Sequence, residues 1–245
     1  SFESRLRWHC HFMQKLEDEP ELEFHNLCRS YDGMREDTFN ASHFERWKEG
    51  LTGYPMVDAC MRALRHTGWL NFRMRAMLAS FSSYHLWLHW REPAVYLGGL
   101  FLDFEPGIHF SQFQMQSGTT GINTIRIYSP AKQARDQDPQ GTFIRRWVPE
   151  LEGVPLSYLA EPHLMTLDQQ DQAGCLIGKD YPRPVVEHAT AYREARQKLA
   201  AFRNRAETRQ EAKAVFLKHG SRKGRRDPIP KTGSSPSNEQ QPLLI

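Results

Sequence analysis

Apolar positions near the start of the chain recur at helical spacing. Side chains three or four residues apart lie on one face of an α-helix, so this spacing predicts an amphipathic helix from the first residues onward. A chain that begins inside such a pattern is expected to be a fragment of a longer protein. The stripe is formed by Phe2, Leu6, Cys10, Met13 and Leu16.

Residues 19–44 are polar and irregular, and two helices are predicted after them. Pro55 suits the first turn of a helix, because a proline lacks the N–H that would have no partner there. The apolar stripe that follows it ends at the Thr67-Gly68 pair. A second helix is expected from about Trp69 to Trp90, because nothing in that stretch alternates as a strand would.

The residue composition of the chain changes twice after these helices. Pro93 and the Pro106-Gly107 pair are expected to break the next stretch into short pieces. Residues 110–124 are polar and rich in Gln, Ser, Thr and Gly. Such a segment beside apolar helices serves either as a linker or as the wall of a site, and we favour the wall. After residue 162 an irregular wrap (163–186) and one long charged helix (189–218) are predicted.

Composition narrows the class of protein only slightly. The 245 residues are 39% hydrophobic and 25% charged, which is ordinary for a soluble globular protein. No stretch approaches the roughly 18 apolar residues that a membrane span needs. The net charge of +3 is too small to demonstrate a nucleic-acid partner. Six Trp, eight Tyr and fourteen Phe offer surfaces for stacking on a ring system, although taken alone they are more simply explained as core residues.

The cysteines form no disulfide or metal pattern. They are scattered, with no CxxC pair and no histidine at zinc spacing. We therefore expect reduced thiols in a cytoplasmic protein and no metal, with an iron–sulfur cluster as the less favoured alternative. The first ten residues also lack the apolar segment of a signal peptide. The cysteines are Cys10, Cys28, Cys60 and Cys175.

Three blocks of sequence together resemble the FAD domain of DNA photolyases and cryptochromes. The first is WKEGLTGYPMVDACMRALRHTGWLNFRMRAMLASF, from Trp47 to Phe81. The second is LHWREPAVYLGGLFLDFE, residues 88–105, and the third is RIYSPAKQARDQDPQGTFIRRWVPEL, residues 126–151. An ordered match of this length is far more specific than a single short motif. It covers residues 1 to about 162.

The resemblance implies an all-α fold that holds FAD in a helical bundle, with the flavin ring deep and its edge open to a DNA-facing cavity. It assigns residues 1–162 to a helical FAD-binding domain, and the composition after that point predicts a wrap with a charged helix (163–218) and a disordered basic and polar tail (219–245). In this family an α/β antenna domain and the loop that grips the FAD phosphates come first, so both are expected before Ser1. This chain is therefore expected to bind FAD poorly by itself.

The resemblance also assigns residues to the flavin. Asp103 matches an acidic residue that accepts hydrogen bonds from the flavin, and Arg75 matches the arginine that pairs with it, in what we expect to be a buried ion pair. Glu105 stands where the family usually has Asp, and Trp69 matches a Trp packed beside the cofactor. Ordinary helix packing or a surface ion pair is the alternative for each. The expected cofactor-binding residues are Trp69, Arg75, Asp103, Phe104, Glu105 and His109.

His109 departs from the family pattern. It stands where the family places a small polar residue facing the flavin atom N5. A histidine there would titrate near neutrality and could supply the proton that turns an anionic flavin semiquinone into the neutral radical. The alternative is a histidine that turns away from the ring and satisfies its nitrogens elsewhere.

On the side expected to face DNA, Trp8 matches a Trp that stacks against a flipped dimer. Met115 stands where a second stacking Trp is usual, which weakens the aromatic clamp. Arg5 and Phe72 replace the Glu and Asn of dimer-repairing enzymes, and Asn71 replaces a His expected for (6-4) repair, so the lesion type is open. The expected DNA-binding residues are Trp8, Arg73, Met115, Arg126 and Gln133.

The electron-transfer chain of the family is altered as well. Trp90 matches its middle tryptophan, whereas Phe113 replaces the member next to the flavin and Asp37 replaces the surface member. Phenylalanine is much harder to oxidise than tryptophan, so hopping along this route should be poor. Trp87, one helical turn before Trp90, offers a bypass, although a packing role is the simpler interpretation.

Together these assignments favour a light-driven DNA repair enzyme that transfers one electron from reduced FAD to a flipped pyrimidine dimer. DNA containing such dimers is the expected partner, and we expect a monomer with no metal and no membrane. The rival is a cryptochrome-type photoreceptor that binds FAD without repairing DNA. The departures that favour the rival are His109, Arg5, Phe72, Phe113 and Met115. A helical DNA-binding module without flavin is the third candidate.

Overall fold

The computed structural model describes residues 2–219, apart from the side chains of residues 2, 4 and 5. The described part is helical, and its only β-type pairing is an isolated bridge between Ile177 and Tyr181. The expected all-α fold is thereby confirmed. The predicted tail beyond His219 lies outside the described residues. None of the described helices is long and apolar enough to cross a bilayer.

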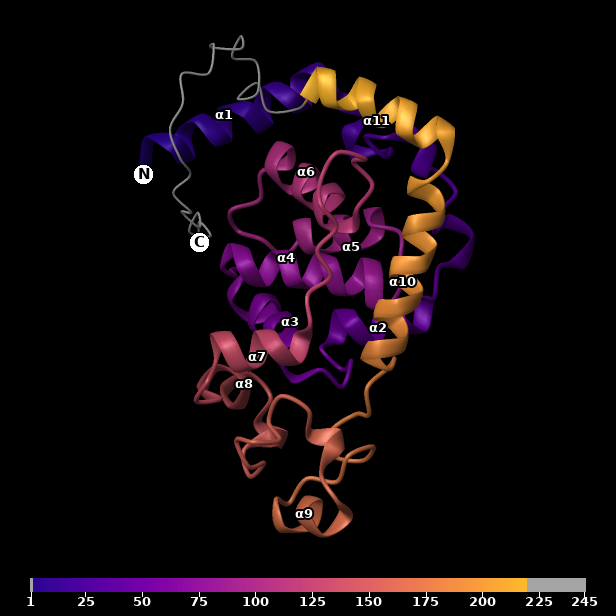
Figure 1. Cartoon of the computed structure of the whole chain (residues 1–245). Helices are drawn as coiled ribbons and strands as arrows, with labels where there is room; N and C mark the ends of the chain where they lie inside the picture. The colour runs from indigo at the N-terminus through magenta and orange to yellow at the C-terminus, as the bar shows by residue number, and fades with distance from the viewer. Residues whose placement is uncertain (1, 220–245) are drawn as a thin grey trace, which may run out of the picture.

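Helices α3 to α6 form the centre of the molecule, and α10 runs along one side of them (Figure 1). Helices α1 and α11 cross one end, and residues 149–187 with α9 extend from the other. The α-helices are α1 Phe2–Asp18, α2 Ala41–Glu49, α3 Pro55–Thr67, α4 Phe72–Ser80, α5 Arg91–Gly98, α6 Pro106–Ser117, α7 Pro130–Gln137, α8 Thr142–Trp147, α9 Leu167–Gln172, α10 His188–Arg203 and α11 Ala206–His219. The shorter turns are η1 Pro20–Glu23, η2 Arg29–Tyr31, η3 Glu36–Thr38, η4 Phe81–His85, η5 Pro149–Leu151 and η6 Pro162–Leu164.

Helix α3 lies at the centre of the core, and its two ends are those that the sequence predicts. Pro55 occupies its first turn, and Gly68 ends it in the left-handed conformation with φ 70°. Nine of its residues are buried, including Val57 and Leu64. Because α2, α7 and α8 pack against α3, the helix is held mainly by packing rather than by intrinsic propensity.

A buried carboxylate fixes the entry to α3. Asp58 accepts hydrogen bonds from the Thr52 backbone N–H (2.8 Å) and hydroxyl (2.6 Å) and from the Gly53 N–H (3.0 Å). The Tyr181 hydroxyl donates a fourth bond of 2.5 Å from a position 123 residues away. Burial and the neighbouring carboxylate raise the pKa of Tyr181, so the hydroxyl keeps the proton that it donates. This cluster ties the C-terminal wrap to the core.

The helix predicted from Trp69 to Trp90 is shorter than expected. Helix α4 begins at Phe72, where the Asn71 side chain accepts the Met74 N–H (3.0 Å), and it changes into the π-helix η4 after Ser80. Regular helical structure ends at His85. Trp87 has a positive φ of 51°, which is rare for a bulky residue. Trp87 and Trp90 are therefore not one helical turn apart, and that prediction is wrong.

Two further expectations about helix boundaries are corrected. The stretch after Trp90 is divided into the short helices α5 and α6, as expected, but the Pro106-Gly107 pair begins α6 rather than lying between elements, since Pro106 stands at the first turn. Gly107 is needed there because a Cβ would lie 2.7 Å from the Phe12 carbonyl oxygen of α1. The long charged helix predicted for residues 189–218 is two helices, α10 and α11, separated at Asn204 and Arg205.

Candidate functional site

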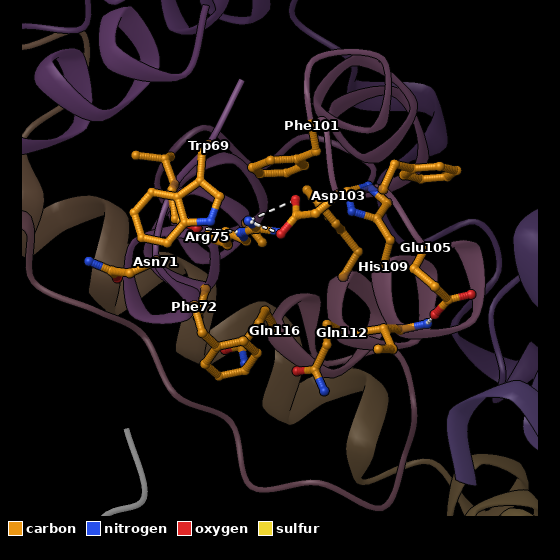
Figure 2. A pocket seen from close by; sticks show the side chains of 16 residues that line it. Trp69, Asn71, Phe72, Arg75, Phe101, Asp103, Glu105, His109, Gln112 and Gln116 are labelled. Atoms are coloured by element: carbon orange, nitrogen blue, oxygen red, sulfur yellow. Dashed lines mark hydrogen bonds and ion pairs between the residues drawn. The ribbon is translucent and has the colours of Figure 1, made fainter. Parts of the chain in front are cut away.

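A cavity of about 380 Å³ opens between α4 and α6, closed at one end by the loop that joins α5 to α6. Most of its wall is aromatic or aliphatic, with a few polar groups directed at the shared space (Figure 2). This combination is typical of a small-molecule or cofactor site. Its wall is formed by residues 69–72, 75, 76, 79, 101, 103–105, 108, 109, 112, 113 and 116.

Arg75 and Asp103 form an ion pair on this wall (Figure 2). The Arg75 Nη2 lies 3.0 Å from Oδ1 and 2.8 Å from Oδ2 of Asp103, and its Nε donates to the Leu70 carbonyl oxygen (2.7 Å). The guanidinium carbon lies 4.0 Å from the centre of the Phe101 ring. The Asp103 side chain is 51% exposed, so the expected buried pair is instead open to the cavity. Its carboxylate can still accept bonds from a ligand.

His109 lies on the cavity wall among four phenylalanine rings. Its Nε2 is 2.7 Å from the Ala94 carbonyl oxygen, which can only accept, so Nε2 carries the proton. Burial lowers the pKa of His109 to about 4, and the Arg75 guanidinium adds to the shift. The surroundings of His109 therefore favour the neutral ring, against the expectation that it titrates near neutrality.

Glu105 and Phe104 border the same end of the cavity. Both carboxylate oxygens of Glu105 cap α6, accepting the Gly107 N–H (3.2 Å) and the Ile108 N–H (2.9 Å). The acceptor that we assigned to the flavin is thus largely occupied by the fold. Phe104 is partly exposed and packs its ring edge-on against His109, with 5.2 Å between the ring centres.

Trp69 is the most exposed tryptophan of the described chain, with 57% of its surface free. It lines the cavity and also a neighbouring hollow of about 350 Å³ that reaches α7 and α8. Leu70 and Asn71 are shared by the two spaces as well. A flat ring can therefore stack on Trp69 from the cavity without displacing a side chain that already covers it.

An aromatic cluster stands at the rim. The Trp8 ring of α1 packs edge-on against Phe12 (4.7 Å between centres) and against Phe72 (6.4 Å). Phe72 itself lines the cavity. The structure therefore brings the N-terminal helix beside the mouth, as the resemblance implies, and joins Trp8 to the Arg75–Asp103 wall through one intervening ring.

The other expected DNA-binding residues are more dispersed. Arg73 of α4 is half-buried and Arg126 is exposed, while Met115 of α6 is half-buried and does not line the cavity. Gln133 of α7 is buried, so a direct contact with DNA would require it to be uncovered. The side chain of Arg5 lies outside the described residues.

The expected electron-transfer residues occupy different environments. Trp90 is fully buried, and its ring lies edge-on to Phe110 with 6.4 Å between centres. Phe113 lines the cavity, whereas Asp37 is exposed on η3. Trp87 is half-buried and lies against α10 rather than toward the cavity.

Several wall residues were not identified individually from the sequence. The expectation that residues 110–124 form a wall is confirmed in part, because Gln112, Phe113 and Gln116 of α6 face the cavity. Together with His109 they lie at helical spacing on one face, a pattern readable in advance had α6 been predicted. The amide nitrogen of Gln112 is buried and has no hydrogen-bond partner among the described residues.

The residues present fit a flavin. The orphaned Gln112 amide offers a donor for a ring carbonyl, Asp103 offers an acceptor for a ring N–H, and Trp69 offers a stacking surface. A buried donor without a partner costs about 1–3 kcal/mol, which a ligand acceptor would recover. We conclude that the wall suits a planar ring bearing both donors and acceptors.

Comparisons with known proteins agree with this chemistry. A family model described as the FAD binding domain of DNA photolyase matches residues 2–201. The chain is 33% identical over 201 residues to a deoxyribodipyrimidine photo-lyase of Alkalihalophilus pseudofirmus, covering 80% of this chain and 41% of that protein. It is 34% identical over 165 residues to cryptochrome-1 of Aedes aegypti, covering 66% of this chain and 30% of that protein.

Among solved structures, the chain is similar to a bacterial class III photolyase from Agrobacterium tumefaciens, with a TM-score of 0.75 and 31% sequence identity. That similarity covers 83% of this chain and 42% of the other. The chain thus spans less than half the length of these relatives. The family match continues to residue 201, through the wrap and most of α10, and a domain boundary at residue 162 stays a prediction.

Proposed function

Because this chain belongs to the DNA photolyase/cryptochrome family and carries its FAD-binding domain, we propose that it serves light-driven repair of pyrimidine dimers in DNA. The observation that carries the proposal is the continuity of one site. A cavity suited to a flavin opens beside Trp8 and Phe72, where a flipped base would meet aromatic rings. Bound FAD would supply the light absorption and the electron, and the protein would hold and orient the two reactants.

The chain's own groups would divide the work on the cofactor. Asp103 and the Gln112 amide would hydrogen-bond the edge of the ring, while Arg75 stays fixed by Asp103, Leu70 and Phe101. Trp69 would cover one face of the cofactor. The neutral His109, tied to Ala94 through Nε2, would stand beside the ring as an acceptor at Nδ1 rather than as an acid.

On the DNA side, stacking on Trp8 and Phe72 would hold extruded bases, a contact that is tolerant of base identity. Arg73 and Arg126 would contact phosphates, which positions the duplex without reading its sequence. The absence of a carboxylate or amide at Phe72 leaves the rim apolar, so selectivity for damage would come from the ease of flipping a distorted base pair.

Photochemical repair by the flavin-loaded protein tests the proposal. The full-length protein is loaded with FAD, chemically reduced and mixed with DNA carrying cyclobutane dimers or (6-4) products, and each lesion is counted before and after blue light. We expect light-dependent loss of one lesion and none in the dark. Trp8→Ala is the matched variant, which should retain FAD but repair more slowly. Retention of FAD with both lesions untouched would reject repair.

Two observations favour the photoreceptor as a second candidate. Phe72 presents an apolar ring at the rim, and Phe113 stands on the cavity wall where tryptophan is usual in the family. Both would leave flavin binding intact while weakening lesion recognition and rapid re-reduction. A photoreceptor would show a light-dependent change in flavin absorption and in α1 or α10 protection from hydrogen exchange, with no change in damaged DNA.

A further inference from the structure

The hollow of about 350 Å³ that adjoins the flavin cavity lies between the start of α4 and helices α7 and α8. Residues 69–71, which lead from α3 into α4, line both spaces. The next residue, Phe72, packs against Trp8 at the mouth of the cavity. DNA held at the mouth therefore lies directly beside this hollow. We call it the α8 hollow, after the helix that supplies Phe143, Arg146 and Trp147 to its wall.

Helix α8 presents aromatic side chains to this space. Phe143 and Trp147 are half-buried, and the centre of the Trp147 ring lies 5.4 Å from that of His66 and 5.3 Å from the guanidinium carbon of Arg146. The largely exposed Trp69 lines the same hollow from the α4 side. Rings that the core does not cover offer stacking surfaces to a flat ligand. The volume also falls within the range of about 300–1,000 Å³ that is usual for small-ligand sites.

Amide groups on the wall of the α8 hollow are free to bind a ligand. Oδ1 of Asn71 caps α4 by accepting the Met74 N–H (3.0 Å), which leaves the Asn71 amide nitrogen as a donor. The exposed side chain of Gln137 forms no hydrogen bond among residues 2–219. An amide that can donate and accept matches the hydrogen-bonding edge of a nucleobase, adenine in particular.

The charge on this wall suits a ligand that carries a phosphate. Asp138 is the single carboxylate among the described residues that line the hollow, and its oxygens accept the N–H groups of Phe143 (3.1 Å) and Ile144 (2.8 Å). Arg146 on the wall and Arg73 beside the mouth form no ion pair within the described part of the chain. A guanidinium without a carboxylate partner is available to a phosphate group.

We propose that the α8 hollow binds one nucleobase of the same DNA whose pyrimidines are held at the mouth. The base stacks on Trp147, and the amides of Asn71 and Gln137 hydrogen-bond its edge. Arg146 contacts the phosphate of the same nucleotide. This inference rests on the proposed function and adds a second base subsite to it.

Extrusion of a dimer gives such a subsite a role. It removes the stacking partner of the flanking base on the damaged strand and the pairing partners of the bases opposite. A hollow that takes up one of these bases stabilises the opened duplex, because the lost stacking is replaced by contact with an indole. The flanking base and the unpaired opposite base are the two sources of the ligand.

A fluorescent adenine analogue distinguishes the two sources. Full-length protein loaded with FAD is mixed in the dark with duplexes that carry one lesion and 2-aminopurine, placed either opposite the lesion or next to it. Because stacking on an indole quenches this analogue, Trp147→Ala should raise its emission in the complex at least about threefold at one position. Tyr192→Ala, which removes an exposed aromatic of α10 outside both spaces, should leave the emission unchanged. The position that brightens identifies the source, and no change at either position overturns the proposal.

Binding affinity separates a base contact from a purely structural role of Trp147. With the intact base, Trp147→Ala should weaken binding of the damaged duplex about tenfold, as expected for the loss of one stacked base. With an abasic site at the responsive position, variant and wild type should agree within about twofold. Trp147→Phe keeps a ring and should recover most of the affinity. Equal losses on the intact and abasic duplexes would overturn the proposal.

FAD content separates DNA from the adenine ring of the cofactor itself. Trp147 does not line the flavin cavity, so Trp147→Ala should retain FAD as wild type does. A loss of FAD would indicate that the cofactor occupies the α8 hollow and would overturn the proposal. Light-dependent loss of lesions without any response of the analogue would reject the base subsite alone. A response without any loss of lesions would reject repair alone.

Discussion

Two of the carboxylates in this protein, Asp58 and Asp103, have opposite surroundings. At the entry to α3, Asp58 is fully buried and accepts four hydrogen bonds from Thr52, Gly53 and Tyr181. On the cavity wall, Asp103 is half exposed and receives its only described bonds from Arg75.

This difference distinguishes polar groups that stabilise the fold from polar groups that can bind a ligand. Every donor around Asp58 is consumed inside the protein, so the cluster stabilises the fold and has nothing to offer a ligand. Around the cavity the Asp103 carboxylate retains free acceptor positions, and the Gln112 amide nitrogen lacks a partner. Polar groups whose hydrogen bonds the fold leaves unsatisfied are those that a cofactor can bind. Variants at the two clusters should therefore affect different measurements.

The largest effect should come from Asp58→Ala. It leaves buried donors of Thr52, Gly53 and Tyr181 without an acceptor, so the free energy of unfolding should fall by about 4 kcal/mol. Denaturant unfolding measures this loss. Asp103→Ala is the matched control, since removal of a half-exposed carboxylate should cost at most about 1 kcal/mol. Similar losses in both variants would remove the distinction between the clusters.

Flavin affinity, unlike stability, should depend most on the cavity wall, and Arg75→Ala tests this. Without the guanidinium, Asp103 loses its partner and the cavity loses the cation over Phe101, so affinity for FAD should fall about a hundredfold. Titration monitored by flavin fluorescence measures the affinity, and thermal unfolding checks that the fold persists. Retention of wild-type FAD affinity would contradict the assignment of this wall.

Substitution of the aromatic residue Trp8 at the mouth of the cavity should have a smaller effect, on affinity for DNA. Trp8→Ala removes one stacking surface, and affinity for DNA carrying a dimer should fall about tenfold with FAD content unchanged. Fluorescence anisotropy with labelled duplexes measures the affinity. Phe39→Ala provides a control, because Phe39 is an exposed aromatic that packs against Phe44 and does not line the cavity. An equal loss in the control would indicate nonspecific weakening.

The last prediction concerns the pH dependence of stability and His109. Its folded pKa of about 4 lies below the ordinary value of 6.5, so the unfolded chain binds more protons between these pH values. Stability should therefore fall as pH is lowered through this window. His109→Asn should reduce the slope by at most about 1.4 kcal/mol per pH unit, as measured by denaturant unfolding between pH 4.5 and 6. An unchanged slope would contradict a neutral buried imidazole.

Sequence reasoning located the elements better than their ends. Helix α3 was predictable because Pro55 and Gly68 act on their own backbone. The end of α4 was not, because η4 and the positive φ of Trp87 depend on packing against α10. The start of α6 at Pro106 was not predicted, for a local reason. A proline marks either a break or a first turn, and the Glu105 cap decides between them.

For the site, the sequence alone identified the family and the residue types on the wall, because an ordered set of sequence blocks can be recognised without knowing which residues are in contact. It brought Arg75 and Asp103 together by resemblance but misjudged their burial, and it gave His109 an ordinary pKa. Tertiary structure decided which polar groups are already paired. The Asn26 partner of Trp90 and the Tyr181 partner of Asp58 lie 64 and 123 residues away in the chain, and such contacts exist only once the helices have packed.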